Sequence, residues 1–160
     1  MLLIFLTAPA VAATLAVDGS TYASIEDAID AAVSGDTILV SAGSWSGCID
    51  PGGADLTIES VSGSGATNLT GSCSQGTVHV SGGETLDISG FTLTAGTSQG
   101  IYVNGSTLIG SDLIVSGYSS NALYAYDADV SIDNSELSNA TTNVYIGGGT
   151  AELVDTIITG

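Results

Sequence analysis

The sequence predicts a parallel β-helix, an all-β fold in which each coil of the chain stacks on the coil before it. Apolar positions at offsets 0, +2, +5 and +7 recur in four segments, which begin at Leu86, Leu108, Val130 and Ala151. Within each segment apolar residues alternate with others, as they do in short strands. A fixed period of about 21–23 residues is typical of a solenoid, whose repeats bury their apolar faces only by stacking.

Residues 1–13, MLLIFLTAPAVAA, resemble the end of a secretory signal peptide, because an apolar run is followed by small residues. The alternative is a buried N-terminal strand. The segment is too short to span a bilayer. We therefore expect a secreted or surface-exposed protein whose β-helix domain spans residues 14–160.

A short amphipathic helix is predicted next. Ser24 is placed to cap it, with Asp27 three residues later as in a capping box. Its apolar residues share one helical face: Ile25, Ala28, Ile29 and Ala32. Gly35 and Asp36 end the helix, and a strand is expected over 37–40. Such a helix would cover the open end of the apolar core.

These segments carry a resemblance. Three consecutive segments of the chain resemble the N-terminal cap and first coil of right-handed parallel β-helices of the pectin-lyase-like superfamily. Their sequences are YASIEDAIDAA, GDTILV and GSW. The resemblance extends over most of the chain, to secreted bacterial β-helix proteins of unassigned function. It implies a right-handed helix with an N-terminal cap. It says little about function, since lyases, hydrolases, adhesins and passive spacers share the fold.

Three columns of strands are predicted from the alternation. Column A holds Ile38/Val40, Leu56/Ile58, Val78/Val80, Ile101/Val103, Leu123/Ala125 and Val144/Ile146. Column B holds Leu86/Ile88 and its repeats, with Cys48-Ile49 and Asn68-Leu69 as early members. Column C holds Phe91/Leu93 and its repeats.

The turn between columns B and C carries residues that tolerate a left-handed backbone or bond their own backbone: Gly90, Asp112, Asn134 and Asp155. We interpret this ladder as structural rather than catalytic, and we expect Asp112 to face solvent. Cys48 and Cys73 lie about one coil apart, so a disulfide is expected in an exported chain. Two buried free thiols are the alternative.

Charge excludes some partners. The chain has 17 acidic residues, no Lys or Arg, and a net charge of −17. Nucleic acid is excluded because no cationic side chain is available to displace counterions from phosphates. Anionic membranes and polyuronates would be repelled as well. No cofactor or metal site is expected, because His79 has no cysteine pair at ligand spacing; calcium stays possible but lacks an Asp-rich loop motif.

The outward residues of column A suggest a binding surface. They read Leu39, Thr57, His79, Tyr102, Tyr124 and Tyr145, and Tyr126 adds a ring two positions after Tyr124. Exposed tyrosines offer apolar rings and a polar group to sugars. The resemblance places the substrate cleft of pectin-lyase-like enzymes on this face. The competing interpretation is that stacked aromatics merely stiffen the sheet.

Catalytic residues are hard to find. The carboxylates closest to column A are Glu59, Asp127 and Asp129, and they form no paired motif for glycoside hydrolysis. The predicted function is a non-catalytic β-helix module with a structural, adhesive or weak glycan-binding role. The alternative is the N-terminal part of a pectin-lyase-like lyase or hydrolase with its catalytic residues beyond residue 160. The last coil lacks a polar cap, so further coils of a parent chain are expected.

Overall fold

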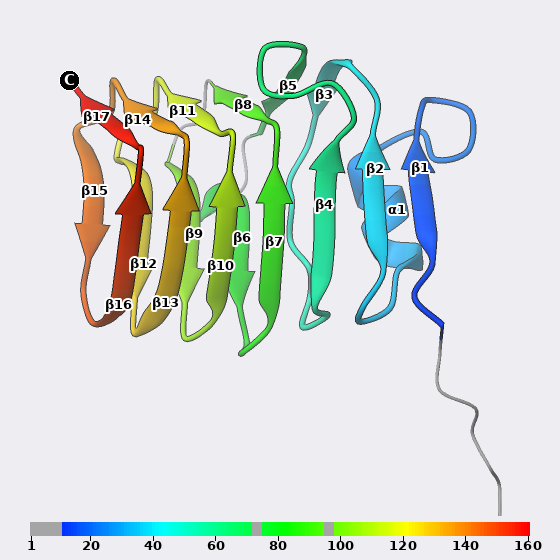
Figure 1. Ribbon diagram of the computed structural model, residues 1–160, viewed down its shortest axis with the longest axis horizontal. Coiled ribbons are helices and arrows are strands. Elements are labelled where there is room, and N and C mark those ends of the chain that lie inside the picture. Colours follow the sequence, from blue (N-terminus) through cyan, green and yellow to red (C-terminus); the bar gives the residue numbers. More distant parts are fainter. Residues whose placement is uncertain (1–10, 72–74, 95–97) are drawn as a thin grey trace, which may run out of the picture.

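The computed structural model describes residues 11–71, 75–94 and 98–160 and confirms the predicted parallel β-helix. Its strands form three parallel sheets along one axis (Figure 1). The chain rises through the front sheet, crosses at the top and descends at the back while advancing to the left, so the coil is right-handed (Figure 1). No helix among the described residues is long and apolar enough to cross a membrane.

The front sheet has seven strands: β1 Thr14–Val17, β2 Thr37–Val40, β4 Leu56–Ser60, β7 Thr85–Ser89, β10 Thr107–Ser111, β13 Ala128–Asp133 and β16 Gly149–Val154. The upper sheet has six: β3 Gly43–Ser46, β5 Thr67–Thr70, β8 Thr92–Thr94, β11 Ile114–Ser116, β14 Glu136–Ser138 and β17 Ile157–Thr159. The rear sheet has four: β6 Gly76–Ser81, β9 Gln99–Asn104, β12 Asn121–Tyr126 and β15 Thr142–Ile146.

The predicted helix cap is confirmed. Helix α1 spans Ile25–Ala31, and the Ser24 side chain accepts a hydrogen bond from the Asp27 backbone N–H. Ile25 and Ala28 are buried on the face that packs on β1 and β2. The helix lies behind these two strands, where later coils have the rear sheet (Figure 1).

The early coils differ from the predicted columns. β2 and β4 belong to the seven-stranded sheet with column B, not to column A, and Leu56 pairs with Leu86. Ile49 instead bridges Val78, and β5 pairs with β8 of column C, so both early members of column B were wrong. The rear sheet begins only at β6, because α1 takes its place in the first coil and the second coil contributes only an isolated bridge at Ile49. Leu39 and Thr57 therefore lie on a different sheet from the tyrosines.

The core is a continuous column of inward aliphatic side chains. The predicted inward residues Phe91, Leu113 and Val115 are fully buried. Burial falls off in the last coil, where Ile158 is 48% exposed although its register equivalent Leu137 is fully buried. Strand β1, which begins at Thr14, was not predicted. Residues 1–10, most of the expected signal peptide, lie outside the described part of the chain.

Candidate functional site

The outer face of the rear sheet carries a row of aromatic side chains in strict register. His79 pairs with Tyr102, Tyr102 with Tyr124, and Tyr124 with Tyr145. Strands β6, β9 and β12 bury the residues that alternate with His79, Tyr102 and Tyr124, so these rings point outward. Tyr145 lies on β15 in register with Tyr124. We call Tyr102, Tyr124 and Tyr145 the tyrosine strip.

The rings of the tyrosine strip stack face to face. The centroids of Tyr102 and Tyr124 lie 5.3 Å apart at an interplanar angle of 1°, and those of Tyr124 and Tyr145 lie 4.7 Å apart at 9°. Desolvation, with smaller contributions from the neighbouring phenols Tyr145, Tyr102 and Tyr126, raises the pKa of Tyr124. Tyr102 and Tyr124 are half-buried, whereas Tyr145 is exposed. The faces of the middle ring are covered by its neighbours, and the strip presents ring edges and hydroxyl groups.

Tyr126 lies beside the strip but outside the stack. It follows Tyr124 by two residues and is 45% exposed, close to the 42% of Tyr145. A Cβ placed on Gly147 would come within 2.8 Å of the Tyr126 ring and 2.9 Å of the Tyr145 ring. Glycine at this position thus lets the two rings approach the chain closely, and among the described residues Tyr126 and Tyr145 are the aromatic side chains with the greatest exposure.

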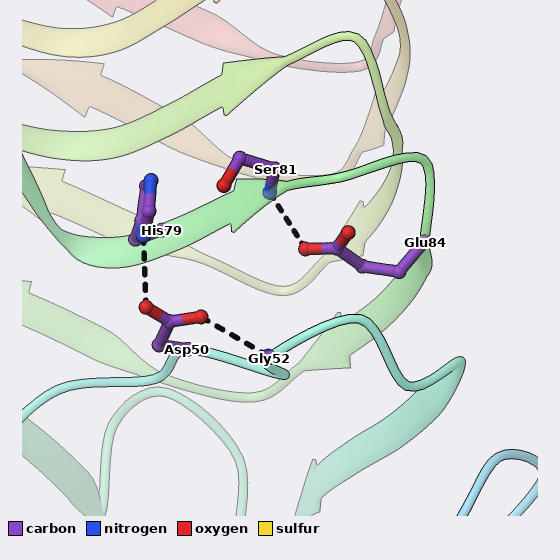
Figure 2. A network of polar contacts seen from close by, with 5 residues as sticks. All are labelled: Asp50, Gly52, His79, Ser81 and Glu84. Carbon is purple, nitrogen blue, oxygen red and sulfur yellow. Dashed lines mark hydrogen bonds and ion pairs between the residues drawn. The ribbon is translucent and has the colours of Figure 1, made fainter.

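An acidic side chain extends the row at its other end. His79 Nδ1 lies 2.9 Å from Asp50 Oδ2, and the His79 ring is tilted by 40° against Tyr102 at a centroid distance of 5.4 Å. Figure 2 shows Asp50 below His79, with its second oxygen turned to Gly52. Sequence reasoning missed Asp50, because the bridge between Ile49 and Val78 that brings it beside His79 was not predicted.

A buried carboxylate closes the turn that follows His79. Glu84 is 3% exposed, and its Oε1 accepts the Ser81 backbone N–H at 2.6 Å (Figure 2). Its Oε2 has no hydrogen-bond partner among the described residues. Through this hydrogen bond Glu84 closes the Gly82-Gly83 turn, while its second oxygen is buried.

The three candidate catalytic carboxylates do not line the tyrosine strip. Glu59 and Asp129 lie on β4 and β13 of the seven-stranded sheet, and Asp127 lies in the turn after β12 with a φ of 47°. Asp129 accepts a hydrogen bond from the Thr150 hydroxyl at 2.7 Å in a shallow groove of about 240 Å³. Asp127 lies next to column A as expected, because it directly follows β12. The expectation was wrong for Glu59 and Asp129, whose strands pair with the strands of column B.

The turn ladder has the predicted backbone. Gly90, Asp112, Asn134 and Asp155 all have positive φ, between 46° and 78°. Asp112 differs from the prediction in one respect, because it does not simply face solvent. Its carboxylate accepts hydrogen bonds from the Ser64 hydroxyl at 2.7 Å and the Ser64 backbone N–H at 3.1 Å. Asp112 therefore ties the loop between β4 and β5 to the ladder.

Two further expectations concern cysteines and metals. Cys73 lies outside the described residues, so its pairing with Cys48 stays a prediction, to be checked by a thiol assay on the native protein. Cys48 lies over α1, where its backbone N–H donates to Glu26 Oε1. Within residues 11–71, 75–94 and 98–160, no group of three or more His, Cys, Asp or Glu side chains is arranged to hold a metal ion.

No protein-family model matches the sequence, and no curated protein matches it. Among solved structures, the chain is similar to a crystal structure of pectin methylesterase in complex with hexasaccharide VII, with 12% sequence identity and a TM-score of 0.47. The match covers 92% of this chain and 66% of the other, so this chain spans less than two thirds of that structure.

Proposed function

We propose that the chain is a non-catalytic β-helix module that holds an extended neutral glycan along the tyrosine strip. The observation that carries the proposal is the stack itself, which repeats a phenol on each of three successive coils at centroid spacings of 5.3 and 4.7 Å. This spacing is comparable to the length of one hexose residue in an extended chain. A glycan parallel to the axis would therefore meet one hydroxyl for each sugar unit.

The stacked geometry sets the mode of contact. Sugar rings cannot lie on the inner faces of the strip, because neighbouring tyrosines already occupy them. Contacts come instead from the phenol hydroxyls and ring edges, with Tyr126 as an additional exposed ring. A net charge of −17 with no Lys or Arg favours a neutral ligand over a polyuronate. An exported location, as the N-terminal segment predicts, would give access to such glycans.

The test removes the tyrosine hydroxyl groups while keeping the stacked rings. A triple variant, Tyr102→Phe, Tyr124→Phe and Tyr145→Phe, keeps the rings but removes the hydroxyls, and Tyr22→Phe is the matched control outside the strip. Each hydroxyl contact contributes on the order of 1 kcal/mol, so millimolar affinity is expected for the native chain. Binding of neutral oligosaccharides is followed by NMR of the tyrosine ring signals.

We expect the triple variant to fold normally and to lose measurable binding, while Tyr22→Phe binds like the native chain. If no neutral oligosaccharide perturbs the ring signals, or if the triple variant binds as well as the control, the strip has only a structural role. Reducing ends are assayed in the same samples. Their release by the native chain would show an enzyme and contradict the non-catalytic part of the proposal.

A further inference from the structure

Asp50 holds the imidazole of His79 in one orientation. The backbone around the pair is fixed, because Ile49 accepts the His79 N–H at 2.8 Å and donates to Thr77 at 2.9 Å. The Asp50 carboxylate is held in turn, since its Oδ1 accepts the Gly52 N–H at 3.1 Å while Oδ2 contacts His79 Nδ1 at 2.9 Å. Both carboxylate oxygens of Asp50 are thus engaged, and both act as acceptors.

This arrangement fixes the tautomer of His79. An ionised carboxylate accepts hydrogen bonds but cannot donate one. When the imidazole is neutral, its proton must therefore sit on Nδ1, and Nε2 is left with a lone pair. Figure 2 shows the second ring nitrogen on the side of the ring away from Asp50. No protein group in the described part of the chain bonds to it.

We propose that Nε2 of His79 accepts a hydrogen bond from a hydroxyl group of the glycan, and that Asp50 is the positioning residue that fixes this acceptor. The inference rests on the proposed function, since His79 continues the register row of the tyrosine strip at 5.4 Å from Tyr102. It also gives the site a means of selection. A sugar hydroxyl can donate to Nε2, whereas an ionised uronate carboxylate at the same position has no proton to donate and would lie near the negative charge of Asp50.

The tautomer is measured directly. His79 is the only histidine of the chain, so long-range ¹H–¹⁵N spectra contain one pair of imidazole nitrogens. At mildly alkaline pH the native protein should show a protonated Nδ1 and an unprotonated Nε2. Asp50→Asn can donate to Nδ1 and should move the spectrum toward the opposite tautomer. Asp55→Asn removes the same charge without contacting His79, and should leave the spectrum unchanged.

Glycan affinity is then measured for the same proteins with the neutral oligosaccharide that binds the native chain. Asp50→Asn should weaken binding about two- to tenfold, the value of one hydrogen bond, and Asp55→Asn should not. A native protein protonated at Nε2 would overturn the inference. Equal affinities for Asp50→Asn and Asp55→Asn would overturn it while the proposed function stands. No binding by the native chain would overturn both.

Discussion

A glycine and a leucine in the core are predicted to be energetically coupled. Gly110 occupies an inward position between Ile88 and Ile132 of the neighbouring coils. A Cβ added to it would lie 3.0 Å from Leu113 Cδ1 and 3.3 Å from Ile132 Cγ1. The fully buried Leu113 side chain therefore fills the space that Gly110 leaves open.

The magnitudes follow from this packing. Leu113→Ala removes three buried carbons, worth about 2.4 kcal/mol at about 0.8 kcal/mol each, and the cavity brings the loss of unfolding free energy to about 3–4 kcal/mol. Gly110→Ala crowds Leu113 and should cost about 1–2 kcal/mol. In the double variant the new methyl group occupies part of the cavity. The combined loss should therefore fall short of the sum by about 1 kcal/mol or more.

Urea unfolding of the native chain, the two single variants and the double variant measures this coupling. Gly65→Ala is the control for the loss of a glycine, because a Cβ there meets nothing within 4 Å. Losses that add within about 0.5 kcal/mol would refute the inference that Leu113 packs over Gly110.

Three further predictions concern single side chains. Hydrogen bonds from the backbone N–H groups of Ala13 and then Val33 lower the pKa of Asp36 in the folded chain. The carboxylate therefore stabilises the fold above the pKa that Asp36 has in the unfolded chain, and this stabilisation is lost as the pH falls through its folded-state pKa. Asp36→Asn should make the unfolding free energy less dependent on pH in this acidic range, and an unchanged pH dependence would contradict the prediction. Burial raises the pKa of Tyr118 to about 12, so the free energy of unfolding should fall as pH rises from about 10 through about 12. Tyr118→Phe should lose less stability over this pH range than the native chain, and an equal loss would contradict the role given to Tyr118. Asp112→Ala should cost about 1–3 kcal/mol and speed amide exchange at Ser64, whose two hydrogen bonds it removes; exchange at the native rate would show that the contact is not formed.

The regular part of the fold could be predicted because its determinants are local. Alternation and period identified the buried inward residues from Val78 to Leu137, and the Asx and glycine positions identified the turn. The early coils could not be assigned in this way. Leu56 precedes Val78 by one repeat length, yet it pairs with Leu86, 30 residues away. All three sheets have the same alternation, so only non-local pairing and loop length decide which sheet a strand joins.

The site shows a second limit of sequence reasoning. Register determines which side chains share a face, and it correctly aligned Tyr102, Tyr124 and Tyr145. It does not determine how the rings turn about their side-chain bonds. Coils are about 4.8 Å apart, close to the distance at which parallel rings stack, so a tyrosine on every coil covers its neighbour instead of offering a face to a sugar. A face-on platform would need aromatic residues on more widely separated coils. An aromatic residue on every coil therefore indicates an edge-on row of hydroxyl groups, and the proposed glycan ligand is expected to bind through hydrogen bonds rather than by ring stacking.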